Sequence, residues 1–365
     1  MYYNRCLRIR RNDTESGNAI QIAEVLNCIG TAHFEMKNYL SAKKFHMEAM
    51  HLKKQSLDES HPDVAFCWYS LGQIYREEEK LNEALSCFQS SLNAIRHCLP
   101  RDHIDIGNTL YNIGFCLLGL NEYGRAVISL SEALRIMNLN FDTNYMKVAE
   151  TSHCLGRAQL MEGLNDDALQ SFNKAIHIKM KYINDQKINN MKELEDMKNC
   201  IDSSLMIVKH KLGTNCPEYA SLLQKRGICL GLLGKFRKAT KAYRKAIAIS
   251  TKIFGPNHMN TANLYFNLGI CVNEKGDPDE GVKYLLKSLK ITSQNMGDEH
   301  HDLVDVYFQI GRAYQANNHV PDATKNYESA LHILKANSSY DTLKASLIIH
   351  HIGDIVSNLN FTLFI

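Results

Sequence analysis

One spacing, 42 residues, runs through the sequence and limits what the chain can fold into. Twelve residues after most of the glycines at this interval stands a small residue, and sixteen residues after them a large one, as in Ala84 and Phe88. Self-similarity at a fixed period predicts a stack of like units, because each unit can bury its apolar side only against its neighbours. The glycines form two in-phase series, Gly30, Gly72, Gly114 and Gly156, followed by Gly227, Gly269, Gly311 and Gly353.

Each unit reads as two helices. From Tyr69 to Ile95 the apolar residues keep a helical period, yet Gly72 lies inside the first helical run. A glycine in a helix interior costs roughly 1 kcal/mol relative to alanine, because it has the most backbone freedom to lose. We expect close packing, with glycine on the first helix and alanines on the second, to offset that cost. The sequence therefore predicts an all-α fold of antiparallel helix pairs.

The second repeat carries a recognisable pattern, with Trp68, Leu71, Gly72, Tyr75, Ala84 and Phe88 at fixed spacings. In these residues the chain resembles the tetratricopeptide repeat family. The 42-residue period, with ESHPDVA leading into the first helix, is similar to the kinesin light chain type of this repeat. The resemblance implies a right-handed superhelical solenoid of antiparallel helix pairs, with about seven full repeats and partial repeats at both ends.

The repeats are predicted to fall into two blocks. Between Gly156 and Gly227 the spacing exceeds the period, so residues are inserted there. The inserted sequence has the pattern of an additional helix, and an extension of the preceding helix followed by a loop explains it equally well. The predicted parts are a repeat remnant and linker at 1–19, four repeats at 20–183, an inserted helix at 184–213, three repeats at 214–340 and the first helix of a truncated eighth repeat at 341–365.

Both ends of the chain resemble half-repeats. YYNRCLRIRR aligns with the second helix of other units and places Tyr3 at the position of Phe88, whereas the eighth unit stops after its first helix. Solenoids normally close with polar-faced terminal repeats. We therefore expect a segment of a longer array, or a repeat fragment of a larger signalling protein, and self-association through the uncapped ends.

Four histidines share one phase in the linkers between units. They lie eleven residues before a repeat glycine and are often followed by an aspartate in the first turn. A histidine that recurs where helices begin favours a helix-start contact over a metal ligand, and an acidic residue in the first turn suits the helix dipole. These residues are His61, His103, His258 and His300.

The composition argues against several classes of function. A formal net charge of +3 over 365 residues makes nucleic acid an unexpected main partner. No apolar run approaches the roughly 20 residues that span a bilayer, so no membrane insertion is expected. Eleven cysteines, an odd number without a C-x-x-C pair, indicate reduced thiols and a cytoplasmic location.

Motifs that carry catalysis are missing from the sequence. It has no H-E-x-x-H, G-x-S-x-G or G-x-G-x-x-G, and GICLGLLGKF departs from a phosphate-binding loop at Cys229 and Phe236. The adjacent histidines at 300–301 and 350–351 cannot share one helix face as residues four apart do. We expect a protein that is not an enzyme and has no cofactor and no metal site.

The family resemblance implies a peptide-binding groove. In this family the first helices line the concave face, and peptide contacts come from residues two or three before the repeat glycine, one after it and about six before it. Asparagine and glutamine can pair with an extended peptide backbone, and aromatic rings can fill side-chain pockets. The predicted groove residues are Asn27, Tyr69, Ser70, Asn108, Tyr111, Asn112, Phe115, His153, Arg157, Gln224, Lys225, Asn263, Phe266, Asn267, Gln309 and Arg312.

The predicted function is that of a non-catalytic scaffold or adaptor, which binds a linear peptide motif or a helix of a partner protein. A second interpretation rests on residues 235–245, where one second helix turns its cations to the convex side. Such a run usually means a solvated helix face, and binding of RNA or acidic lipid is the alternative. The cations are Lys235, Arg237, Lys238, Lys241, Arg244 and Lys245.

Overall fold

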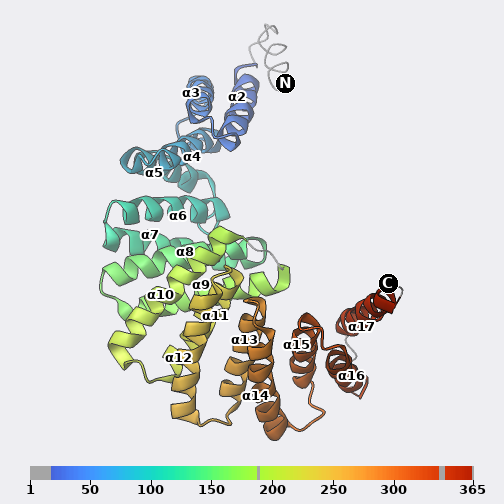
Figure 1. Cartoon of the computed structure of the whole chain (residues 1–365). Coiled ribbons are helices and arrows are strands. Elements are labelled where there is room, and N and C mark those ends of the chain that lie inside the picture. The colour runs from blue at the N-terminus through green and yellow to red at the C-terminus, as the bar shows by residue number, and fades with distance from the viewer. Residues whose placement is uncertain (1–17, 187–189, 337–341, 364–365) are drawn as a thin grey trace. The chain divides into compact units, whose positions relative to one another are not determined.

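The computed structural model describes residues 18–186, 190–336 and 342–363, and every regular element in these ranges is an α-helix (Figure 1). The predicted all-α array of helix pairs is therefore confirmed. The chain divides into two compact units, residues 1–187 and 188–365. We describe the units one at a time.

The first unit consists of four helix pairs in sequence order, blue to green in Figure 1. Within each pair a short turn reverses the chain, and each second helix also packs on the first helix of the next pair. The pairs are α2 (Asn18–Glu35) with α3 (Tyr39–Ser56), α4 (Pro62–Glu77) with α5 (Leu81–Cys98), α6 (Ile104–Gly119) with α7 (Tyr123–Leu139), and α8 (Phe141–Met161) with α9 (Asn165–Gln186).

The second unit contains three pairs flanked by a single helix on each side. The helix α10 (Met191–Leu212) packs on α11, and α17 (Thr342–Leu363) packs on α16. Between them lie α11 (Pro217–Leu232) with α12 (Phe236–Phe254), α13 (Met259–Glu274) with α14 (Pro278–Met296), and α15 (Leu303–Ala316) with α16 (Val320–Ala336).

The helix α10 lies within the inserted segment and takes the place of a second helix before the first pair of its unit. Its buried face includes Leu194, whose carbonyl accepts a hydrogen bond from Cys229 Sγ at 3.1 Å. Asp202 accepts from Arg226 Nε at 2.7 Å. The helix α10 thus packs on α11 as each second helix packs on the first helix that follows it.

The repeat glycines make room for one large side chain each. A Cβ built on Gly72 would lie 2.7 Å from Phe88 Cε1, closer than carbon atoms can approach. In the first seven repeats the glycine is therefore explained by the large residue sixteen positions later. That contact accounts for the glycine better than the small residues of the second helix do. Gly353 on α17 differs, because nothing lies within 4 Å of a Cβ at that position.

The turn inside each pair has a backbone signature that repeats with the same period. Seven residues after each of the first seven repeat glycines, one residue has positive φ, between 57° and 94°. Glycine tolerates this left-handed region, whereas other residues pay a steric cost in it. The residues are Lys37, Glu79, Asn121, Gly163, Gly234, Gly276 and Asn318.

Three of the four linker histidines cap the helices that follow them. In each case Nδ1 accepts a hydrogen bond from the backbone amide two residues later, as His61 does from Asp63 at 3.2 Å, His103 from Asp105 at 3.2 Å and His258 from Asn260 at 3.1 Å. His300 accepts the same kind of bond at 3.2 Å, but from Asp302, the residue before α15. The predicted helix-start role is thus confirmed for the first three.

The expectation that the chain opens with half a repeat falls on residues that lie outside the described part. At the other end, α17 carries exposed apolar side chains at Leu343, Leu347 and Ile349, while Ala345 and Ile348 are buried. A helix is present at the predicted place, residues 342–363. Self-association through it stays a prediction.

Candidate functional site

The first helices α4 and α6 line a pocket of about 410 Å³ in the first unit. One wall is a stripe of α4, another is the N-terminal half of α6, and the floor comes from α5. Its size is within the range of about 300–1,000 Å³ that ligand pockets usually have. The lining residues are Pro62, Ala65, Phe66, Tyr69, Ser91, Ile95, Leu99, Asp105, Asn108 and Thr109.

This pocket, which we call the α4–α6 pocket, has an apolar interior and a polar edge. Phe66 is 48% exposed although it is a large aromatic residue, and Ile95 and Leu99 also line the pocket. Asp105 and Asn108 contribute a carboxylate and an amide at the edge. An exposed aromatic ring beside convergent polar groups is typical of a site for an apolar side chain of a ligand.

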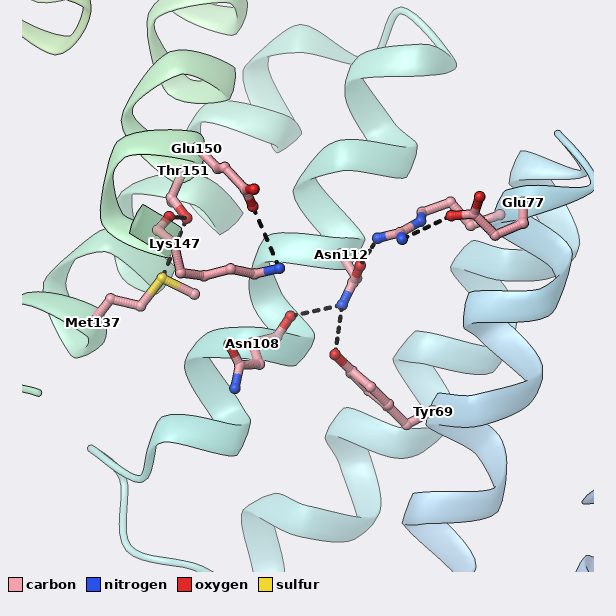
Figure 2. A network of polar contacts seen from close by, with 9 residues as sticks. Tyr69, Glu77, Asn108, Asn112, Met137, Lys147, Glu150 and Thr151 are labelled. Atoms are coloured by element: carbon pink, nitrogen blue, oxygen red, sulfur yellow. Dashed lines mark hydrogen bonds and ion pairs between the residues drawn. The ribbon is translucent and has the colours of Figure 1, made fainter. Parts of the chain in front are cut away.

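A buried amide holds the two helices in place beside the pocket (Figure 2). Asn112 is 1% exposed, and its Nδ2 donates to Tyr69 Oη and to the Asn108 carbonyl, both at 3.0 Å. Its Oδ1 accepts a short bond from Arg76, whose guanidinium also pairs with Glu77 at 3.0 Å. The network therefore fixes the spacing between α4 and α6.

These bonds change the role that the sequence suggested for Asn112. A direct peptide contact was expected, but both amide hydrogens are already donated within the chain and the side chain is buried. A buried polar group keeps such partners, because losing them is costly. Asn112 therefore positions Tyr69 and Arg76, and the surface for a ligand comes from its neighbours.

Burial raises the pKa of the Tyr69 hydroxyl, so this phenol stays protonated at neutral pH. Its oxygen accepts from Asn112 and leaves the phenol hydrogen for another acceptor. Asn108, half-buried on α6, also has its side-chain amide at the pocket. Together they could bind the backbone of an extended peptide.

A second hollow of about 510 Å³ lies at the C-terminal ends of the same helices and takes in one residue of α8. Arg76 lies over the ring of Phe115 at 5.6 Å from the centroid. Arg157 is exposed and makes no ion pair within the described residues. This hollow, the Arg157 pocket, is suited to an acidic group, although Glu77 and Glu79 moderate its charge.

The neighbouring part of α8 continues the network seen in Figure 2. Lys147 lies 4.5 Å from the ring centroid of Tyr111 and pairs with Glu150 at 3.5 Å, while Thr151 Oγ1 donates to Met137 Sδ at 3.2 Å. Tyr111 is only 7% exposed. The half-buried His153 packs near the Phe172 ring at 6.2 Å. Tyr111 is thus mainly a core residue.

Besides Asn112 and Tyr111, two further predicted groove residues are interior to the first unit. Asn27 is 5% exposed, with Oδ1 3.0 Å from His46 Nδ1, and Ser70 is 7% exposed. The structure gives them packing roles. Conversely, the sequence reading left out Phe66 and Arg76, although Phe66 lies six residues before Gly72, the position that singled out Asn108 six before Gly114.

The other predicted residues lie in the second unit, which forms its own hollow of about 420 Å³. Asn267 lines it with Ile228 and Ile270, and its Nδ2 donates to the Asn263 carbonyl at 2.9 Å. Gly231 stands where the first unit has Arg76, so Asn267 is not tied to an arginine as Asn112 is. Apolar residues and the Asn267 amide line most of this hollow, and Glu274, which pairs with Arg312 at 3.1 Å, adds a carboxylate.

Several of the remaining predicted groove residues of the second unit contact other residues of the chain. Gln309 accepts from Arg312 at 3.3 Å, and Arg312 pairs with Glu274 at 3.1 Å. Phe266 packs against the core. Gln224 and Lys225 are half-buried, and burial lowers the pKa of the Lys225 ammonium. The predicted residues therefore form two separate sets, one in each unit.

Features of other kinds of site can be stated for the described residues. They contain no cluster of three or more His, Cys, Asp or Glu side chains arranged to hold a metal ion. No disulfide joins any of their ten cysteines, most of which are buried. In the same ranges no helix has both the length and the apolar character needed to cross a membrane.

Comparison with protein families shows which family the chain belongs to. The profile of the Tetratricopeptide repeat matches residues 21–97, 218–280 and 261–336, more than half of the sequence. The chain belongs to this family. No curated protein matches it.

Several solved structures are similar to the chain. The kinesin light chain-type repeats from Podosopora anserina are 12% identical, with 63% of this chain and 94% of that one covered and a TM-score of 0.37. BtubC from P. vanneervenii is 17% identical, with coverage of 71% and 93% and a TM-score of 0.37. Aspartyl phosphate phosphatase F from Bacillus subtilis is 14% identical, with coverage of 93% and 75% and a TM-score of 0.41.

Proposed function

We propose that this tetratricopeptide repeat protein is a non-catalytic adaptor that binds an extended peptide of a partner protein on the first helices α4, α6 and α8. The observation that carries the proposal is the α4–α6 pocket, where the exposed Phe66 ring adjoins an apolar floor and free polar groups. Ligand pockets usually combine such an apolar lining with a few polar groups that fix the orientation of the ligand.

The chemistry of the two pockets defines the peptide. The α4–α6 pocket accepts one large apolar side chain, while Tyr69 and Asn108 pair with the peptide backbone. In the Arg157 pocket the arginine attracts a carboxylate, because it has no ion pair within the described residues. The preferred peptide thus combines a large apolar residue with an aspartate or glutamate.

The spacing of these two peptide residues follows from helix geometry. Asn108 and Phe115 mark the two pockets on α6, seven residues apart. At 1.5 Å per residue this is about 10 Å along the helix. An extended peptide advances about 3.3 Å per residue, so the acidic residue lies about three positions from the apolar one.

A cytoplasmic location completes the proposal. No disulfide joins the cysteines in the described part, which is usual for proteins of reducing compartments. Partners are then other cytoplasmic proteins with an exposed linear segment. We include no cofactor and no catalytic step in this function.

Selection from a random peptide library tests the proposal. Purified full-length protein is used as bait, and Phe66→Ala serves as a counter-bait after circular dichroism has shown equal helicity. We expect wild-type protein to enrich peptides with a large apolar residue about three positions from an acidic one. Enrichment of the same peptides by Phe66→Ala, or of none by either bait, would overturn the proposed site.

A further inference from the structure

A strongly basic surface lies on the second helices of the second unit, and none of its residues is assigned to peptide binding. The helix α12 has no acidic residue along its whole length, and α14 adds three outward lysines. We call this surface the basic face. It consists of Arg237, Lys238, Lys241, Lys245, Lys252, Lys283, Lys287 and Lys290, all of them exposed.

The cations of the basic face point in one direction. At 100° per residue, those of α12 fall within about 120° of the helix circumference, opposite the buried Ala239, Tyr243 and Ala246. The face also continues from one repeat to the next, because Lys283 and Lys287 stand 42 residues after Lys241 and Lys245. Equal positions in stacked repeats share one orientation, so the lysines form two rows across the helices.

The two helices that carry these rows are tied together side by side. Arg244 on α12 pairs with Glu280 on α14 at 2.9 Å and donates to Tyr284 Oη at 3.4 Å. Nearer the other end of α14, Asn295 Nδ2 donates to the Asn257 carbonyl at 2.9 Å. The rows are therefore held as one surface.

Most of the charge on this surface is uncompensated. Lys287 lies over the Tyr265 and Tyr284 rings at 5.4 and 5.8 Å from their centroids. The other seven cations make no ion pair with any described residue. Like charges held this closely repel one another, and an anionic surface relieves the repulsion.

An apolar side chain accompanies the cations. Leu286 is 43% exposed next to the lysines of α14. Exposed cations with an aliphatic side chain beside them are typical of proteins that lie on an anionic membrane surface, where the apolar group enters the headgroup region.

The same face is poorly suited to single-stranded nucleic acid. Recognition of unpaired bases uses open aromatic rings for stacking. Tyr243 is 3% exposed, and Tyr284 is bonded to Glu280 and Arg244 beneath Lys287. A lipid surface needs charge and an apolar contact, and the basic face offers both.

We propose that the basic face binds the surface of membranes rich in anionic phospholipids, without any helix crossing the bilayer. The peptide site of the first unit takes no part in this contact. The protein would thereby hold a peptide-bearing partner at a membrane.

Co-sedimentation with vesicles tests this proposal. We expect full-length protein to bind vesicles of phosphatidylcholine mixed with phosphatidylserine, to ignore pure phosphatidylcholine, and to dissociate as salt is added. The variant Lys245→Glu/Lys290→Glu should bind at least about tenfold more weakly, since each lysine near such a surface contributes about 1 kcal/mol.

Two further variants serve as controls. Lys44→Glu/Lys181→Glu changes the net charge by the same amount on exposed second-helix lysines of the first unit, and its binding should stay within about twofold of wild type. Leu286→Ser should weaken binding about threefold or more and keep the salt dependence. Equal loss in both charge variants, or no binding to the anionic vesicles, would overturn the proposal, as would binding of a duplex RNA by protein that ignores them.

Discussion

At the scale of single residues, the first repeat differs from the others at the position that packs on the glycine. His46 stands there, whereas Phe88 and Phe172 occupy it in the second and fourth repeats. The His46 side chain is 1% exposed and lies 3.0 Å from Asn27 Oδ1. Burial lowers its pKa from 6.5 to about 4, so the folded chain holds this imidazole neutral.

This shift predicts a pH dependence of stability. The folded pKa lies below the unfolded one, so the stabilisation is complete above pH 6.5 and is lost as the pH falls from 6.5 towards 4. Between pH 7 and pH 5 we expect the free energy of unfolding of the first repeat to fall by about 2 kcal/mol. Hydrogen exchange measured across this range in wild type and in His46→Phe checks it, and an equal pH slope in both would contradict the account.

The repeat glycines give a second prediction at this scale. Gly72→Ala brings a methyl group against the Phe88 ring, and crowding of this kind costs about 1–3 kcal/mol, more than the gain in helix propensity. Gly353→Ala meets no neighbour and should stabilise α17 by up to about 1 kcal/mol. Hydrogen exchange measures the local free energy of opening, and we expect Gly72→Ala to lower it and Gly353→Ala to raise it. Changes of the same sign in both variants would refute the packing explanation.

At the scale of helices and turns, the 42-residue period was enough to predict the helix pairs. It was not enough to predict which groove side chains are exposed. The Asn112 position fitted a peptide contact, but Arg76, 36 residues earlier, occupies its amide oxygen. Such a pairing depends on how two repeats are rotated against each other, which the spacing of residues within one repeat does not contain. The exposed Phe66 was missed for the opposite reason, because apolar residues on a helix are usually read as core.

The positive-φ turns give a prediction for this scale. Lys37 adopts φ 57° although it is not a glycine, and Gly163 has φ 81° at the equivalent position. Lys37→Gly should stabilise the α2–α3 pair by about 0.5–1 kcal/mol, whereas Gly163→Ala should destabilise the α8–α9 pair by a similar amount or more. Hydrogen exchange of the two pairs gives the comparison. A loss of stability in Lys37→Gly would show that the turn is held by its side chain and not limited by its backbone.

At the scale of the whole molecule, the two units carry different chemistry on the same repeat. In the first unit the first helices present an open aromatic pocket and an arginine, and in the second unit the second helices present rows of lysine. The sequence predicted both surfaces as alternatives for one function. Because they lie on different helices of different units, they are compatible with each other, and we propose that the protein uses both.

A charge exchange between protein and peptide tests the central claim, that the first unit binds an apolar and acidic peptide on its first helices. The peptide carries a large apolar residue and a glutamate three positions away, and fluorescence anisotropy gives its affinity for the full-length protein. We predict that Arg157→Glu weakens binding about tenfold or more and that changing the glutamate to lysine restores it for this variant alone. Equal affinities of wild type and Arg157→Glu for both peptides would contradict the claim.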